Sequence, residues 1–168
     1  MNNLFIKNTF LFIILVLLQV LIFNHIGYLG YIHPMVYLIF ILIFPYREER
    51  IPFLFAAFLI GLWVDIFSNT GGIHAASSVF VAYIRSRIIR IVFGQNFEYQ
   101  EIKLPTLPFA KVFSYTTIIV VLHHTLFYFL EVFNFNHLFT TILKIGTASA
   151  STIAVCLLSI YIFSPQKK

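Results

Sequence analysis

The chain has 168 residues, of which 60% are hydrophobic and only 10% are charged, and 21 of them are phenylalanine. A soluble domain carries about 25% charged residues, so this composition excludes an ordinary soluble domain and indicates an integral membrane protein. The single cysteine, Cys156, excludes an internal disulfide framework and a cysteine metal site. Short polar clusters separate the apolar runs and leave no room for a separate soluble domain, so we expect one all-α transmembrane domain over residues 1–168.

Six apolar segments follow one another along the chain. A membrane span needs about 20 apolar residues at a rise of 1.5 Å per residue to cross roughly 30 Å of hydrocarbon. We place helices near residues 5–23, 31–45, 52–67, 73–93, 110–133 and 138–163. No small-residue cleavage site follows the first segment, so we interpret it as a retained helix. The second and third segments are short for a full crossing, and we expect their flanking loops to pack inside the bundle.

The basic residues give an independent indication of topology. With the amino terminus in the cytoplasm, ten of the eleven Lys and Arg residues fall at cytoplasmic ends or loops, and Lys144 lies toward the outer side. This asymmetry satisfies the positive-inside rule and favours an even number of spans with both termini in the cytoplasm. We expect Arg85, Arg87 and Arg90 to anchor their helix by reaching the headgroups. The net charge of +5 therefore reflects topology and gives no indication of nucleic-acid binding.

The longest polar segment covers residues 94–108, between the fourth and fifth predicted helices. Its prolines, Pro105 and Pro108, end any helix there. Two interpretations stay open, a simple connector and a docking surface for a cytoplasmic partner.

Three charged residues lie in the outer part of the predicted bundle. Asp65 lies about 13 residues from the cytoplasmic start of its helix, and Lys144 about six residues from the outer end of the last helix, so their depths match. Because a charge at the centre of a membrane helix costs about 2.5–3.5 kcal/mol on insertion scales, such a side chain faces protein and finds a partner. We expect Lys144 to pair with Asp65 or Glu131. A contact with a partner or ligand, and a proton or ion pathway, are the alternatives.

Neither a metal site nor catalytic chemistry is predicted. His123 and His124 are adjacent, so their side chains point about 100° apart on a helix and do not share one site. His74 and Asp65 supply only two ligands, whereas zinc takes three or four. The sequence contains no nucleophile elbow, phosphate-binding glycine loop or metalloprotease pattern. We therefore expect a protein that is not an enzyme and has no cofactor.

Small residues recur at every fourth position of the last predicted helix, at Gly146, Ala150 and Ala154. Such a ridge lets two helix backbones approach closely. It predicts either packing inside this chain or docking of a transmembrane helix from another protein.

Several short motifs resemble, in their order and spacing, one family of bacterial membrane proteins. They are Gln19, then Phe44-Pro45-Tyr46, then Gly61-Leu62-x-x-Asp65-x-Phe67-Ser68-x-x-Gly71-Gly72-x-His74-Ala75-Ala76, and finally Tyr83-Ile84-Arg85. The arrangement is similar to that of the rod shape-determining protein MreD family, especially the form found in Bacteroidota. The resemblance covers most of the chain and is strongest over residues 44–90.

The resemblance implies a six-helix bundle with a fold similar to the substrate-binding subunits of energy-coupling-factor vitamin transporters. It also implies a non-enzymatic scaffold in the bacterial cytoplasmic membrane, surrounded by membrane lipid, that maintains rod shape during peptidoglycan synthesis. Its partners would be the MreB filament, a single-span MreC-like protein, RodA and a class B penicillin-binding transpeptidase. The alternative function is the vitamin-binding subunit of such a transporter. The outward-side candidates for that binding site are Asp65, Asn69, His74, Glu131 and Lys144.

Overall fold

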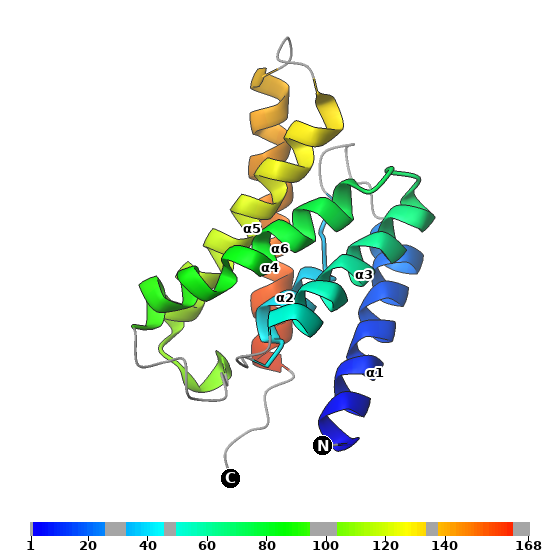
Figure 1. Cartoon of the computed structure of the whole chain (residues 1–168). Coiled ribbons are helices and arrows are strands. Elements are labelled where there is room, and N and C mark those ends of the chain that lie inside the picture. Colours follow the sequence, from blue (N-terminus) through cyan, green and yellow to red (C-terminus); the bar gives the residue numbers. More distant parts are fainter. Residues whose placement is uncertain (1, 26–32, 46–49, 95–103, 134–137, 163–168) are drawn as a thin grey trace.

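The computed structural model describes residues 2–25, 33–45, 50–94, 104–133 and 138–162, and the regular elements in these ranges are all helical (Figure 1). The long helices are α1 (Asn2–Leu18), α3 (Arg50–Ser68), α4 (Ile73–Phe93), α5 (Phe109–Val132) and α6 (Leu138–Ile162). Three short elements are the π-helical turn η1 (Gln19–Phe23), α2 (Leu38–Ile43) and the 3-10 turn η3 (Leu104–Thr106). The predicted all-α fold is therefore confirmed for the described residues.

Four helical stretches are long and apolar enough to cross a membrane. They are Ile6–Phe23, Ile51–Ser68, Phe109–Val132 and Leu138–Ile162. Only 17% of the first stretch is buried inside the molecule, against 50% of the α5 stretch, so α1 presents most of its apolar surface outward. An apolar surface of this extent suits lipid rather than water. Helix α4 has the predicted bounds, but it carries three arginines and is not among these four stretches, and the count of six spans stays a prediction.

The predicted helix near residues 31–45 is wrong over residues 33–37. Helix α2 begins only at Leu38 and has six residues, so it rises roughly 9 Å, far less than a bilayer crossing. Pro34 lacks a backbone N–H and disfavours helical geometry at the residue before it. The described residues from Pro34 to Leu42 are all buried. An apolar run of this kind is equally typical of a lipid-facing span and of a buried core segment, which is why the pattern misled the prediction.

Polar side chains from two other helices satisfy the non-helical backbone before α2. Gln19 accepts a hydrogen bond from the Val36 N–H at 2.7 Å and donates one to the Pro34 carbonyl at 3.2 Å. Thr152 of α6 accepts one from the Met35 N–H at 3.0 Å. Irregular backbone that is shielded from water is tolerated only where protein groups satisfy its N–H and C=O groups. The buried side chains of Gln19 and Thr152 therefore make the hydrogen bonds that this backbone does not make within a helix.

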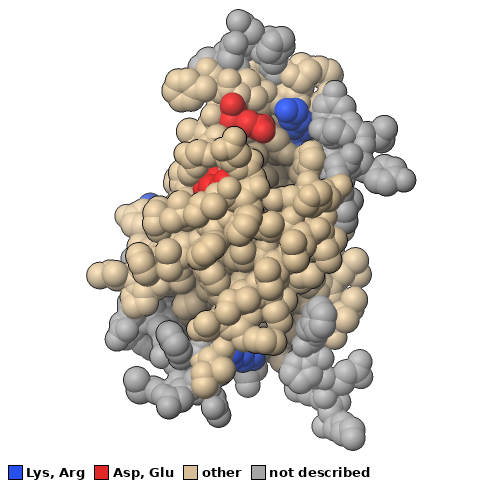
Figure 2. Space-filling model, turned by 90° about the vertical axis from the view of Figure 1, so that its right-hand side faces the viewer, with Lys and Arg blue, Asp and Glu red and all other residues tan. Residues whose placement is uncertain are grey.

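The chain runs back and forth between two ends of the molecule. Helix α1 begins and α6 ends at what we call the lower end, whereas the α3–α4 turn, the last turn of α5 and the first turn of α6 lie toward the upper end (Figure 1). Successive helices pack against one another from α3 to α6. The predicted loop positions 26–30 and 134–137, and most of the polar segment 94–108, lie outside the described residues. In Figure 2, the middle of this face shows neither Lys or Arg nor Asp or Glu, and acidic and basic side chains lie side by side toward the upper end.

Candidate functional site

The central motif of the resemblance forms the α3–α4 hairpin, and Asp65 caps its second helix. The Asp65 side chain is near the end of α3 and is only 4% exposed. Its two carboxylate oxygens accept hydrogen bonds from the backbone N–H groups of His74 at 3.0 Å and Ala75 at 2.8 Å, and one also accepts from the Thr70 hydroxyl. The first N–H groups of a helix have no partner within it, and the negative charge of a carboxylate there is also stabilised by the positive end of the helix dipole.

Glycines make the rest of this hairpin possible. Gly71 and Gly72 have φ angles of +65° and +96°, which residues with a Cβ rarely adopt. Gly61 lies where α3 touches α4, because a Cβ built on it would stand 2.5 Å from the Ala75 Cα atom. Phe67, in contrast, is 57% exposed. The motif residues therefore serve mainly to build one close, capped helix pair.

His74 continues from this hairpin into a buried polar cluster. Its Nδ1 atom lies 2.9 Å from the Tyr37 hydroxyl, which also lies 2.9 Å from Nε2 of His123. His124 points elsewhere, with Nδ1 at 2.9 Å from the Val120 carbonyl and Nε2 at 3.2 Å from the Thr152 hydroxyl. The two adjacent histidines thus have separate partners. Among the described residues, no three His, Cys, Asp or Glu side chains are placed to hold a metal ion together.

A cavity of about 420 Å³ opens at the upper end of the molecule. Its wall is formed by residues from η1, the segment before α2, α3, α4, α5 and α6, namely Gln19, Val20, Asn24, His25, His33, Met35, Phe67, Ser68, His74, Phe127, Tyr128, Glu131 and Lys144. The volume lies within the range of about 300–1,000 Å³ that is typical of small-molecule sites. Of the five outward-side candidates, His74, Glu131 and Lys144 line this cavity, whereas Asp65 and Asn69 do not.

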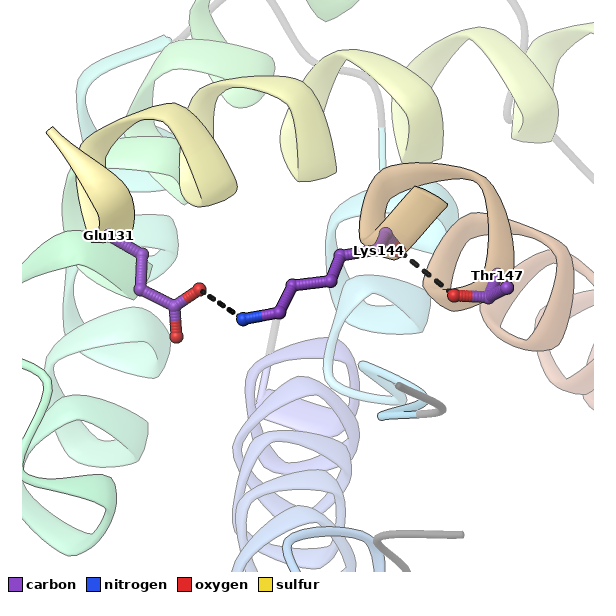
Figure 3. Close-up of polar contacts among 3 residues, drawn as sticks. All are labelled: Glu131, Lys144 and Thr147. Carbon is purple, nitrogen blue, oxygen red and sulfur yellow. Dashed lines mark hydrogen bonds and ion pairs between the residues drawn. The ribbon is translucent and has the colours of Figure 1, made fainter. Parts of the chain in front are cut away.

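Glu131 and Lys144 face each other across the α5–α6 hairpin. The Lys144 Nζ atom lies 3.9 Å from a Glu131 carboxylate oxygen, and the side chains are 35% and 40% exposed, respectively. Figure 3 shows the two side chains reaching toward each other from different helices. Of the two predicted partners of Lys144, Glu131 is the one that the structure places beside it. A loose, partly exposed pair of this kind contributes only about 0–1 kcal/mol, so its charges stay open to other partners.

Sequence reasoning missed several residues of the cavity wall. Asn24 accepts a hydrogen bond from Gln19 at 3.0 Å and donates one to the Ser68 hydroxyl at 2.9 Å, which ties the end of η1 to the end of α3. Gln19 carried a usable signal, because an amide inside an apolar helix needs a polar partner. Asn24 and Ser68 lie at helix ends, where polar residues are common, and gave no such signal.

The structure corrects the expectation for Arg85. It was expected to reach the headgroups, yet it is only 2% exposed. Its guanidinium donates hydrogen bonds to the carbonyls of Leu42 at 3.2 Å and Phe44 at 2.6 Å and to the Tyr115 hydroxyl at 2.8 Å. It also lies 5.0 Å from the centre of the Phe53 ring. Arg85 therefore holds the end of α2, whose last carbonyls have no partner in the helix.

The small-residue ridge of α6 lies on the outside of the molecule. Gly146, Ala150 and Ala154 are all exposed, and a Cβ built on Gly146 would meet nothing within 4 Å. The interpretation as packing within this chain is therefore not supported for the described residues.

These features define an all-helical protein with four helices of membrane-spanning length and a polar cavity at one end. Comparison of the chain with protein families, with curated proteins and with solved structures finds no match.

Proposed function

We propose that this chain is a non-enzymatic membrane scaffold of the bacterial cell-elongation machinery, equivalent in role to MreD. The observation that supports the proposal best is that the residues of the motif that resembles the MreD family contact one another in the structure. The Asp65 carboxylate binds the N–H groups of residues nine and ten positions later, and Gly61 permits the contact between the two helices. The spacing of these residues is therefore set by contacts that they make with one another, which supports a shared structural motif over a chance coincidence of common residues.

The surface suits a protein that works by lateral contact inside the membrane. Most of the described surface belongs to helices, and large apolar side chains cover the outer faces of α1, α3 and α6. The exposed ridge at Gly146, Ala150 and Ala154 would allow close approach of a partner helix. We propose a single-span MreC-like protein, RodA and its class B transpeptidase as membrane partners, with the MreB filament at the cytoplasmic face. The chain would then reside in the bacterial cytoplasmic membrane as a multi-pass protein.

Depletion of the protein in its native bacterium tests this function. Rod-shaped cells should become spheres as the protein is lost, and the wild-type gene supplied in trans should restore the rods. An MreC-like protein should also co-purify with the tagged chain. Unchanged rod shape after clean depletion, in a genome with no second copy, would contradict the scaffold function.

The cavity favours a second candidate function, a small-molecule binding subunit of an energy-coupling-factor type transporter. Its polar wall and its volume of about 420 Å³ suit a ligand of vitamin size. A ligand retained through purification, or a coupling module that co-purifies with the chain, would support this function. Absence of both, together with an MreC-like partner, would favour the scaffold.

A further inference from the structure

Three polar residues of the cavity wall, Gln19, Asn24 and Ser68, are already hydrogen-bonded to each other. The Gln19 amide uses its oxygen on the Val36 N–H and its nitrogen on the Pro34 carbonyl and the Asn24 side chain. The Asn24 nitrogen donates to Ser68. These groups shape the wall and hold its helices together, so they contribute little free hydrogen-bonding capacity to a ligand.

Glu131 and Lys144 differ from those groups because they are loosely paired. Their closest charged atoms are 3.9 Å apart, and each side chain keeps more than a third of its surface exposed. A close charge-assisted hydrogen bond has a distance of about 2.7–2.9 Å, so both groups can gain from a better partner. The cavity therefore offers one cation and one anion a few ångströms apart.

The hydrogen bonds of Tyr37 assign a further donor to the cavity. The Tyr37 hydroxyl has one proton but lies 2.9 Å from both His74 and His123, so one of these rings must donate to it. Nδ1 of His123 is buried and has no hydrogen-bond partner among the described residues. Because an orphaned buried N–H is rarer in proteins than an orphaned acceptor, the proton of a neutral His123 belongs on Nε2, where it reaches Tyr37.

This assignment fixes the state of His74. If His123 donates to the Tyr37 oxygen, the Tyr37 proton can go to Nδ1 of His74 at 2.9 Å or to the Met35 sulfur at 3.8 Å. Because a thioether is the weaker acceptor, the hydroxyl donates to Nδ1, and the N–H of a neutral His74 is on Nε2. In the described part of the chain, the ring's hydrogen bond is the one at Nδ1, and His74 lines the cavity. His74 thus supplies a second donor, besides Lys144, in the same wall as the Glu131 acceptor.

We propose that this cavity binds a small zwitterionic group, one that carries an ammonium and an anionic oxygen group within a few ångströms. Lys144 and His74 would meet the anion, and Glu131 would meet the ammonium. The apolar wall residues Phe67 and Phe127 would pack against the uncharged part of the ligand. This proposal deepens the second candidate function and rests on its premise that the cavity is a binding site.

The paired charges also select against other ligands. A multiply charged anion is repelled by Glu131, and a simple cation is repelled by Lys144, so neither satisfies both groups. Two sources share the proposed chemistry, the headgroup of phosphatidylethanolamine and a free amino acid. The cavity lies at one end of helices that are long and apolar enough to cross a membrane, so a lipid headgroup and a soluble ligand could both reach it.

Binding of the purified full chain to matched compounds tests the proposal. One arm measures thermal unfolding in nanodiscs that contain phosphatidylethanolamine or, in parallel, only phosphatidylglycerol, which has the phosphate without the ammonium. The other arm titrates L-leucine, the matching carboxylic acid and the matching amine by calorimetry. We expect stabilisation or binding by at least one zwitterion, with at least tenfold weaker binding for compounds that carry a single charge.

Single charge removals then locate the site. Glu131→Gln and Lys144→Gln should each weaken binding of the zwitterion at least tenfold, whereas Lys111→Gln, which removes an exposed lysine near the start of α5, should leave it unchanged. A response to phosphatidylethanolamine alone identifies a lipid headgroup, and a response to leucine identifies a soluble ligand; both support the proposal. A cavity that binds only singly charged or uncharged compounds would overturn the zwitterion and leave a binding function standing. A cavity that binds none of the compounds would overturn both.

Discussion

The polar cluster around Arg85 and the upper cavity both place a charge among apolar helices, but they differ in how completely that charge is satisfied. Arg85 is 2% exposed and donates hydrogen bonds to Leu42, Phe44 and Tyr115. Lys144 is 35% exposed, and its acidic neighbour lies at 3.9 Å. The closed cluster builds the fold because its bonds are made within the chain. The open pair adds little to stability and leaves charge available to a ligand.

Loss of Arg85 should be the most damaging change. Arg85→Met keeps much of the side-chain volume but leaves the Phe44 carbonyl without its donor and the Leu42 carbonyl with the Tyr115 hydroxyl alone. A hydrogen bond to a charged group contributes about 1.5–3 kcal/mol and Arg85 donates three of them, so the loss should exceed about 3 kcal/mol. Reversible unfolding in mixed micelles should show a loss of this size. The exposed neighbour Arg87 provides the control, because Arg87→Met should change stability by no more than about 0.5 kcal/mol. Equal stability of the two variants would show that Arg85 does not hold α2.

A methyl group at Gly61 should have the next largest effect. In Gly61→Ala the new Cβ would stand 2.5 Å from backbone atoms of Ala75, which cannot move aside as a flexible side chain can. Overpacking of this kind costs about 1–3 kcal/mol. Gly146→Ala is the matched control, since its Cβ meets nothing within 4 Å and alanine favours a helix. The same unfolding assay should therefore separate the two variants, and a neutral Gly61→Ala would mean that α3 and α4 lie further apart.

Removal of the Asp65 cap should cost less. Asp65→Ala leaves the N–H groups of His74 and Ala75 without their acceptor, and loss of a helix cap costs about 0.5–2 kcal/mol. Asp65→Asn keeps one acceptor oxygen and should retain part of the stability. Hydrogen exchange at His74 and Ala75 should be faster in the alanine variant. Unchanged exchange there would contradict the capping role.

The cavity charges should have the smallest effect on stability. Glu131→Gln and Lys144→Gln each remove one member of a partly exposed pair, so unfolding free energy should change by about 0–1 kcal/mol. A much larger loss in ligand-free protein would place this pair with Arg85, as part of the fold. Circular dichroism and unfolding midpoints of each variant beside the wild type check this expectation.

The long helices could be predicted from the sequence because their apolar runs are bounded by clear breaks. The predicted segment 73–93 coincides with α4, and 110–133 is within one residue of α5 at each end. The segment 31–45 failed because its chain path depends on Gln19 and Thr152, which bond its backbone from helices distant in sequence. No local pattern reports such a contact.

The site was predictable only in part, for a similar reason. Matched depth pointed to Asp65 as a partner of Lys144, and Glu131 was the second alternative, which is the one that the structure places beside the lysine. Asp65 looked equally available to Lys144, because its charge was visible in the sequence but its bonds to the α4 backbone were not. The burial of Arg85 was hidden by its place among three arginines. In each instance the deciding partner was a backbone group, which sequence patterns do not reveal.

The most direct test of the difference between the two regions is a thermal unfolding comparison of Arg85→Met with the double variant Glu131→Gln/Lys144→Gln, each with and without phosphatidylethanolamine or leucine, whichever stabilises the wild type. Arg85→Met should unfold at a clearly lower temperature and still be stabilised by the zwitterion. The double variant should unfold near the wild-type temperature and show no stabilisation. A double variant that is as unstable as Arg85→Met, or that responds to the ligand as the wild type does, would contradict the assignment of the cavity as an open binding site.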